Sequence, residues 1–271
     1  MKVGLLIDTT KCVGCGACTL ACKEANGLPS GDAGDAGDTN NANELSATTW
    51  TVVEEHEGVH VRRQCMHCQD PACASVCPVA ALHKTPEGAV VYDEDKCIGC
   101  RYCMMACPFG IPRYEWSKQA PRVRKCILCY EAATRHGRPT ACAAVCPSGA
   151  TKFGERTGLL AEAETRLRQE PGRYVNHVFG QHEAGGTSVM YLAAIGFERL
   201  GFRTTVEKAP YPQLTWNVLS RLPAVVSTAG VALAGVFWLG KRRQEVAKQE
   251  RAEKEGKEGK KNGADASGGG R

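Results

Sequence analysis

Short apolar runs separated by polar loops recur through the first part of the chain. The runs Val3–Asp8 and Val90–Asp93 are too short for helices, and Trp50–Glu55 alternates between apolar and polar positions. Runs of this length and pattern predict β-strands. Gly149–Gly154 predicts a further strand, which we expect to close the same core.

The next segment predicts an amphipathic helix. Thr157–Glu170 is followed by Pro171, a residue that ends helices. Its apolar residues recur at helical spacing and share one face: Leu159, Leu160, Ala163 and Leu167. We expect this face to pack on the core.

A longer apolar run follows. Leu222–Gly240 contains nineteen residues without a charge. At about 1.5 Å per residue such a helix spans roughly 30 Å, the thickness of the hydrocarbon layer of a membrane. Trp216 and Trp238 lie near its two ends, where aromatic residues meet lipid headgroups. A buried core helix is the alternative, but core helices are rarely apolar on every face. The run predicts a single transmembrane helix over residues 219–241.

Positive charge after this helix predicts its orientation. Arg221 precedes the run, whereas Lys241, Arg242 and Arg243 follow it, and residues 242–271 form a charged tail that we expect to be a solvated helix or disordered. The positive-inside rule places this tail in the cytoplasm. The cysteine-containing part then lies on the periplasmic side of the inner (cytoplasmic) membrane, in a single-pass topology. No signal-peptide or twin-arginine pattern is visible, so we expect export together with a signal-bearing partner.

Sixteen cysteines fall into four groups of four, and none is left over. The first and third groups share spacers of two, two and three residues, which are typical of bacterial ferredoxins. The second and fourth groups widen one of these spacers. The groups are Cys12, Cys15, Cys18 and Cys22; Cys65, Cys68, Cys73 and Cys77; Cys97, Cys100, Cys103 and Cys107; and Cys126, Cys129, Cys142 and Cys146.

This spacing predicts [4Fe–4S] clusters, in which each of four irons takes one thiolate. Three cysteines of a tight loop hold three corners of one cluster, and the fourth cysteine reaches the neighbouring cluster. Sixteen thiolates then ligate four clusters. Disulfides are an unsuitable alternative, because they are typical of small secreted scaffolds, whereas this chain is long and its cysteine spacing differs from theirs. Zinc, which favours paired Cys-x2-Cys spacing, remains an alternative for the fourth group.

Composition limits the function further. The chain has 271 residues, of which only 6% are aromatic, so we expect the clusters to act as cores and folding to depend on metal. The formal charge is +5 and the pI is about 8.4. Each oxidised cluster with four thiolates carries about −2, which leaves the loaded chain slightly negative and argues against nucleic-acid binding.

Motifs for substrate chemistry are missing from the sequence. It contains no dinucleotide-binding Gly-x-Gly-x-x-Gly pattern and no P-loop, and every cysteine belongs to a cluster motif. We therefore predict no catalytic residues and expect a non-catalytic protein.

The repeat of strand, cysteine loop and short helix predicts an α+β fold. We expect two fused bicluster ferredoxin-like modules and one C-terminal transmembrane helix. A Gly/Asp-rich insertion is expected to be a surface loop, with a calcium loop as the alternative. The predicted boundaries are 1–26 (first motif, module A), 27–49 (insertion), 50–120 (module B, second and third motifs), 121–156 (return to module A, fourth motif), 157–218 (helical and extended linker), 219–241 (transmembrane helix) and 242–271 (charged tail).

The motifs around the cysteines resemble a known family. They are similar to the four-cluster electron-transfer subunits of bacterial respiratory oxidoreductases of the formate dehydrogenase N and hydrogenase-2 type. The resemblance implies a subunit that carries electrons between two partners. One is a catalytic subunit containing molybdenum, tungsten or nickel–iron, and the other is an integral membrane cytochrome b or quinone-binding subunit. The motifs are Cys65-Met66-His67-Cys68, Cys97-Ile98-Gly99-Cys100-Arg101-Tyr102-Cys103, Lys125-Cys126 and Gly185–Tyr191.

Cross-ligation within the two modules assigns each cysteine to a cluster. We predict cluster 1 at Cys12, Cys15, Cys18 and Cys146; cluster 2 at Cys22, Cys126, Cys129 and Cys142; cluster 3 at Cys65, Cys68, Cys73 and Cys107; and cluster 4 at Cys77, Cys97, Cys100 and Cys103. The resemblance implies that cluster 1 faces the catalytic subunit and that cluster 4 lies nearest the membrane.

Four polar residues lie beside predicted ligands. His67 is expected to pack beside a cluster rather than to ligate iron. Arg101, Arg124 and Lys125 are candidates to raise a cluster's reduction potential through their charge. Solvated surface positions are the alternative for these three.

Two hypotheses follow for the function. The first is a membrane-anchored electron conduit inside a multisubunit oxidoreductase. The second is a cytoplasmic, polyferredoxin-like carrier whose apolar C-terminal helix docks on a soluble oxidoreductase. In both, the chain transfers electrons and does no substrate chemistry of its own.

Overall fold

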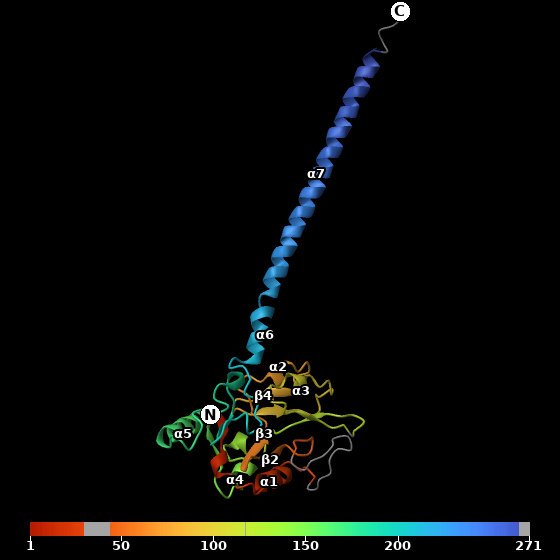
Figure 1. The fold of residues 1–271 in the computed structure, drawn as a ribbon. Helices are drawn as coiled ribbons and strands as arrows, with labels where there is room; N and C mark the ends of the chain where they lie inside the picture. The colour runs from red at the N-terminus through yellow and green to blue at the C-terminus, as the bar shows by residue number, and fades with distance from the viewer. Residues whose placement is uncertain (30–43, 117, 266–271) are drawn as a thin grey trace, which may run out of the picture. The chain divides into compact units, whose positions relative to one another are not determined.

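Strands and short helices alternate through most of the chain, as the sequence predicts. The computed structural model describes residues 1–29, 44–116 and 118–265 (Figure 1). Most of the Gly/Asp-rich insertion, and with it the alternative of a calcium loop, lies outside these residues. The chain divides into two units, Met1–Leu214 and Thr215–Arg271.

Every strand predicted from the apolar runs is present in the first unit. Within the described residues, four further strands lie between the predicted ones in the sequence, and β9 follows them. The strands are β1 (Val3–Asp8), β2 (Thr51–His56), β3 (Val59–Gln64), β4 (Leu82–Lys84), β5 (Val90–Tyr92), β6 (Arg113–Tyr114), β7 (Val123–Arg124), β8 (Thr151–Glu155) and β9 (Val189–Leu192). The helices are α1 (Ala17–Ala25), α2 (Ala72–Ser75), α3 (Tyr102–Ala106), α4 (Ala141–Ala144) and α5 (Arg156–Gln169), with shorter turns η1 (Thr9–Lys11), η2 (Thr134–His136) and η3 (Glu183–Gly185).

The first strand lies at the centre of a sheet with the order β8-β1-β9. β1 pairs antiparallel with β8, where Leu5 lies opposite Phe153, and parallel with β9, where Leu5 lies opposite Val189. All six residues of β1 are buried. A strand with neighbours on both edges and layers on both faces has no polar side, which explains the unbroken apolar run at Val3–Ile7.

The other strands form antiparallel hairpins. β2 pairs with β3, β4 with β5, and β6 with β7. The turn between β2 and β3 has two residues, Glu57 and Gly58, with φ of +52° and +77°. Two positive φ values in succession match the twist of the flanking strands, so this short turn fixes their register. β3 leads directly into the second cysteine group.

The short helices form two pairs. α1 packs against α4, and α2 packs against α3. Each pair joins helices that follow cysteine loops far apart in the sequence. The first and fourth cysteine groups therefore lie together, and so do the second and third.

Residues 157–218, expected to form a linker, supply part of the core. The predicted helix Thr157–Glu170 is confirmed as α5, whose buried Leu159 and Ala163 pack in one cluster with Met190 of β9. The aromatic rings of Tyr191, Phe179, Phe197 and Phe202 form a second cluster, with neighbouring ring centroids 4.7 to 5.6 Å apart. Such contacts bury large apolar areas, so this segment closes the first unit.

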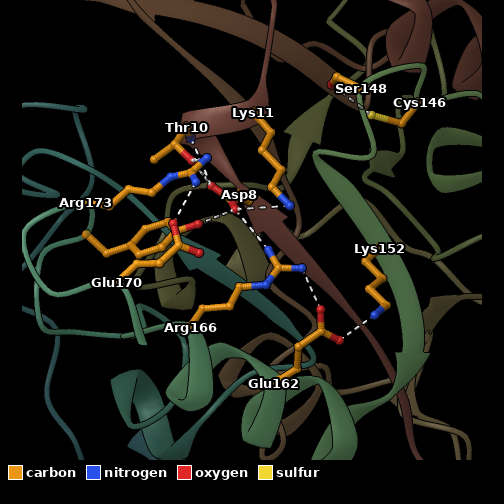
Figure 2. Close-up of polar contacts among 11 residues, drawn as sticks. Asp8, Thr10, Lys11, Cys146, Ser148, Lys152, Glu162, Arg166, Glu170 and Arg173 are labelled. Carbon is orange, nitrogen blue, oxygen red and sulfur yellow. Dashed lines mark hydrogen bonds and ion pairs between the residues drawn. The ribbon is translucent and has the colours of Figure 1, made fainter. Parts of the chain in front are cut away.

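Asp8 anchors the chain where β1 ends and the first cysteine loop begins (Figure 2). Its buried carboxylate accepts hydrogen bonds from Arg166 Nη1 and from the Tyr174 hydroxyl, both at 2.9 Å. The Thr10 hydroxyl also donates to it, at 2.6 Å. A buried charge is tolerated only with partners of this kind. The network ties β1, α5 and the approach to Cys12 together.

The second unit is helical. α6 (Tyr211–Leu219) is followed by α7 (Leu222–Asp265), whose first part is the predicted apolar segment Leu222–Gly240. Within residues 1–29, 44–116 and 118–265, one helical segment is long and apolar enough to cross a membrane, and it includes this part of α7. The helix continues without a break into the charged tail predicted after residue 241.

Candidate metal centres

The sixteen cysteines gather in four sets, each of which joins cysteines from two sequence groups. Sets 1, 2 and 4 each line a cavity. Set 1 is Cys12, Cys15, Cys18 and Cys146; set 2 is Cys22, Cys126, Cys129 and Cys142; and set 4 is Cys77, Cys97, Cys100 and Cys103. In set 3, Cys68 lies within electrostatic range of Cys65, Cys73 and Cys107. The sets have the members that cross-ligation predicts, while iron ligation itself stays a prediction.

Each set lies next to the following one. Thiols of neighbouring sets lie within electrostatic range of each other: Cys18 and Cys142 for sets 1 and 2, Cys126 and Cys65 for sets 2 and 3, and Cys73 and Cys103 for sets 3 and 4. The order of the sets in space is therefore 1, 2, 3 and 4.

The cavities fit a polynuclear cluster better than a single ion. Ligands of one zinc ion converge on a point about 2.3 Å from each sulfur. Among the described residues, which include every cysteine, no three His, Cys, Asp or Glu side chains are placed to hold one metal ion. Nothing here favours zinc at the fourth group. Four thiols around a shared volume are instead the donor set that a [4Fe–4S] cluster requires.

Left-handed backbone in the cysteine loops directs the thiols toward the cavities. Gly14 and Gly16 have φ of +73° and +69°, and Gly99 and Arg101 repeat this pattern at +70° and +65°. Glycine adopts this conformation freely, whereas arginine is strained by about 1 kcal/mol or more. The turn also aims backbone N–H groups at sulfur, since the Gly99 N–H donates to Cys97 Sγ at 3.4 Å.

Burial keeps several of these thiols protonated in the absence of a cation. Desolvation, reinforced by the neighbouring Cys142, raises the pKa of Cys22 to about 12. Burial likewise raises the pKa of Cys73 to about 12. Because iron binds thiolates, ligation would displace these protons, and metal binding would be coupled to folding.

Set 3 is bordered by polar side chains that are buried or half-buried. Lys125 Nζ donates to the carbonyls of Val90 at 2.5 Å and of Cys126 at 2.9 Å. Lys84 Nζ donates to the Cys68 carbonyl at 2.7 Å. His67 is fully buried and its Nδ1 accepts from the Val90 N–H at 2.9 Å. Burial, together with the charges of Lys125 and Lys84, holds the pKa of His67 well below its ordinary value, so it packs as a neutral ring.

The three cations singled out in the sequence differ in environment. Lys125 is buried. Arg124 forms ion pairs with Glu94 at 2.5 Å and with Glu115 at 3.0 Å. Arg101 is exposed and its guanidinium lies 5.5 Å from the centroid of the Trp116 ring. Of these three, Lys125 alone is shielded from solvent enough for its charge to act strongly on a cluster.

Sequence reasoning missed Arg62 and Gln64 of β3. Each is 2% exposed, and they line the cavities of set 1 and set 2, respectively. Burial lowers the pKa of Arg62, but the adjacent Cys142 and Cys18 outweigh it and the net shift is upward. The available signal was the polar residue at every second position before Cys65, which indicates one strand face. Charged residues are ordinarily exposed, so this pattern would have predicted a solvent-facing side of the strand, whereas the structure buries it.

The two end sets reach the surface. In set 1, Cys15 is exposed, and the adjacent Val13 is 62% exposed. In set 4, Ile98 and Tyr102, which lie between or beside its cysteines, are 64% and 58% exposed. Exposed apolar side chains gathered at one place are typical of contact surfaces for other proteins.

Comparisons with known proteins agree with the cysteine pattern. The 4Fe-4S dicluster domain family matches residues 57–156, and the 4Fe-4S binding domain family matches residues 4–24. These matches identify ferredoxin-type domains that bind [4Fe–4S] clusters.

Three relatives are similar over 70% or more of this chain. The hydrogenase-2 operon protein HybA of Escherichia coli O157:H7 is 38% identical over 238 residues, covering 73% of this chain and 72% of that protein. The iron–sulfur subunit of the nitrate-inducible formate dehydrogenase of Escherichia coli K12 is 38% identical over 202 residues, with coverage of 70% and 68%. The formate dehydrogenase iron–sulfur subunit of Haemophilus influenzae is 35% identical over 251 residues, with coverage of 87% and 79%.

A side chain at Gly14 is expected to disrupt set 1. A Cβ at this position would lie 2.7 Å from ring atoms of His60, at a φ of +73°. We expect Gly14→Ala to lower the iron content of the purified protein by about four irons, the content of one cluster. Iron and protein assays measure this loss.

Gly16→Ala is the matched control. Its φ is +69°, but no atom lies within 4 Å of the added Cβ, so it carries the backbone strain without the clash. Combining Gly14→Ala with His60→Ala should restore iron. Equal losses from Gly14→Ala and Gly16→Ala would show that the clash is irrelevant.

Proposed function

Since this chain belongs to the family of iron–sulfur subunits that includes HybA and the formate dehydrogenase subunits, we propose that it carries electrons between the catalytic and membrane subunits of a respiratory oxidoreductase. It is an electron-transfer subunit and not the catalytic one. The observation that carries the proposal is the gathering of all sixteen cysteines into four adjacent sets. A bound [4Fe–4S] cluster accepts and releases one electron at a time.

We propose two fused bicluster modules that hold four clusters in total. Module A comprises residues 1–26 and 121–156, and module B comprises residues 50–120. The packing of α1 on α4 and of α2 on α3 supports this division. The antiparallel pairs β1–β8 and β4–β5 support it too, because each joins strands of one module.

The order of the sets supports a path with two ends. Sets 1 and 4 are the ends, since each has one neighbouring set, and both reach the surface. We propose that the catalytic subunit docks at set 1, beside Val13 and Cys15. The integral membrane cytochrome b or quinone-binding subunit would dock at set 4, beside Ile98 and Tyr102. By resemblance, the catalytic metal is molybdenum, tungsten or nickel–iron.

The apolar part of α7, Leu222–Gly240, supports association with a membrane. We propose that it spans the inner membrane once, packed on the membrane subunit. Lys241, Arg242 and Arg243 follow the apolar segment directly, so the positive-inside rule favours a cytoplasmic tail and a periplasmic cluster unit.

Cross-ligation predicts different outcomes for two cysteines of the same sequence group. The loaded wild-type protein should contain about sixteen irons. We expect Cys146→Ser to alter the same electron paramagnetic resonance signal as Cys15→Ser, because all four thiols of set 1 hold one cluster. Cys142→Ser should instead alter the signal that Cys22→Ser alters. The ligand sets are wrong if Cys142→Ser and Cys146→Ser change one common signal, and about twelve irons with one zinc would exclude four clusters.

Interrupting set 4 tests the proposed exit to the membrane. We expect Cys100→Ser in the assembled complex to lower quinone-linked turnover at least about tenfold, because one ligand of the last cluster is weakened. Turnover with an artificial dye that accepts electrons at the catalytic subunit should be retained, and it serves as the control for assembly. Normal quinone-linked turnover in a complex shown to lack this cluster would place the exit elsewhere.

The orientation of α7 predicts which side of the membrane exposes the tail. An epitope tag placed after Arg251 should resist protease in intact spheroplasts and be cleaved after their lysis, because the tail is cytoplasmic. A tag cleaved in intact spheroplasts would reverse the orientation. A tag recovered in the soluble fraction would favour the polyferredoxin-like carrier.

A further inference from the structure

One face of β3 is polar and runs along two cysteine sets. His60, Arg62 and Gln64 occupy every second position of the strand, so they share a face. His60 abuts Gly14 in the loop of set 1, Arg62 lines the cavity of set 1, and Gln64 lines the cavity of set 2. Polar groups on a buried face are unfavourable unless they meet polar partners.

The side chains on the opposite face of β3 have packing or hydrogen-bonding partners within the protein. Val61 is fully buried in the main hydrophobic cluster. Arg63 donates from Nη2 to the Gly201 carbonyl at 2.7 Å, and its guanidinium lies 4.4 Å from the centroid of the Phe202 ring. Two adjacent arginines therefore have opposite surroundings, and only Arg62 faces the cysteines.

Arg62 is a buried cation that no carboxylate neutralises within the described part of the chain. Its Nε, Nη1 and Nη2 lack a well-formed hydrogen bond among the described residues, and the Cys142 thiol is the side chain in range to accept one. The strand is held at this point by its backbone, since the Tyr191 hydroxyl donates to the Arg62 carbonyl at 2.8 Å. An isolated buried charge is strongly unfavourable, so the guanidinium requires an anion. The thiols near enough to supply negative charge are Cys18 of set 1 and Cys142 of set 2.

Gln64 repeats this situation at set 2. It is 2% exposed, and its Nε2 has no acceptor within the described residues. Buried Lys125 and half-buried Lys84 differ, because they already donate to backbone carbonyls. Those lysines link protein segments to each other, whereas Arg62 and Gln64 line the cysteine cavities and their unpaired N–H groups make no such link.

We propose that Arg62 is a countercharge shared by the clusters of sets 1 and 2, and that Arg62 and Gln64 together raise their reduction potentials. This inference rests on the proposed function. An added electron makes a cluster more negative, so a fixed cation and N–H donors beside it stabilise the reduced form. Arg62 acts on both sets, and Gln64 acts on set 2 alone. Both are positioning residues, since neither ligates iron.

Potentiometric titration of the complete complex, followed by electron paramagnetic resonance, tests the proposal. The couples of sets 1 and 2 are assigned by the signals that Cys15→Ser and Cys22→Ser alter. We expect Arg62→Met to lower the ratio of reduced to oxidised cluster at a fixed potential by about tenfold in both couples, because one hydrogen-bonded charge is lost. This is a shift of about 59 mV for one-electron couples. Gln64→Met should shift the set 2 couple alone, and by less.

Controls separate this inference from the proposed function. Arg63→Met removes the same charge from the other face of β3 and should leave both couples within about twofold of wild type, and Arg62→Lys should restore part of the shift. Unshifted couples in an iron-replete Arg62→Met complex would overturn the inference alone. If Arg62→Met fails to retain iron, Gln64→Met decides, and an unshifted set 2 couple overturns the inference. A wild-type complex without these couples would instead overturn the proposed function.

Discussion

The need to gather buried thiols around shared metal clusters determines how this chain can close its core. Cys22, Cys65 and Cys126 belong to a hydrophobic cluster and to cysteine sets at the same time. The same side chains thus contribute to apolar packing and belong to the proposed ligand sets. Loops with few aromatic residues and helices of one turn cannot bury enough surface by themselves. The left-handed turns, the short helices and the central position of β1 all serve to hold these thiols around shared volumes.

The charges inside the first unit follow from the same constraint. Clusters with four thiolates are anionic, and a low-dielectric interior accepts anions only near cations. Lys84, Lys125 and Arg62 supply these cations from three different segments. The lysines also fasten backbone carbonyls, which gives them a structural role that Arg62 lacks. Strand alternation determines which side chain of β3 faces the cysteines, since a shift of β3 by one residue would put Val61 or Arg63 in the place of Arg62.

Sequence patterns predicted the parts of this structure that depend on local spacing. The cysteine spacers, the apolar run of β1 and the leucine face of α5 each fit within a few residues, so their signals are local. β9 could not be predicted in this way, because its place in the sheet depends on parallel pairing with β1 at the other end of the first unit. Arg62 escaped prediction because its burial is compensated by groups distant in the sequence, and a pattern of polarity cannot represent such a partner.

The meeting of Cys146 with Cys12, Cys15 and Cys18 in one cavity also governs the order in which the protein can mature. A growing polypeptide has exposed all four thiols of set 3 once Cys107 has left the ribosome, whereas set 1 lacks its fourth thiol until Cys146 emerges. During synthesis Cys12, Cys15 and Cys18 therefore lack the fourth thiol of their set, while sets 3 and 4 already have all four. The four thiols of set 1 are the last of the four sets to be complete, so the N-terminal cysteine loop can close around a cluster only after Cys146 has been synthesised.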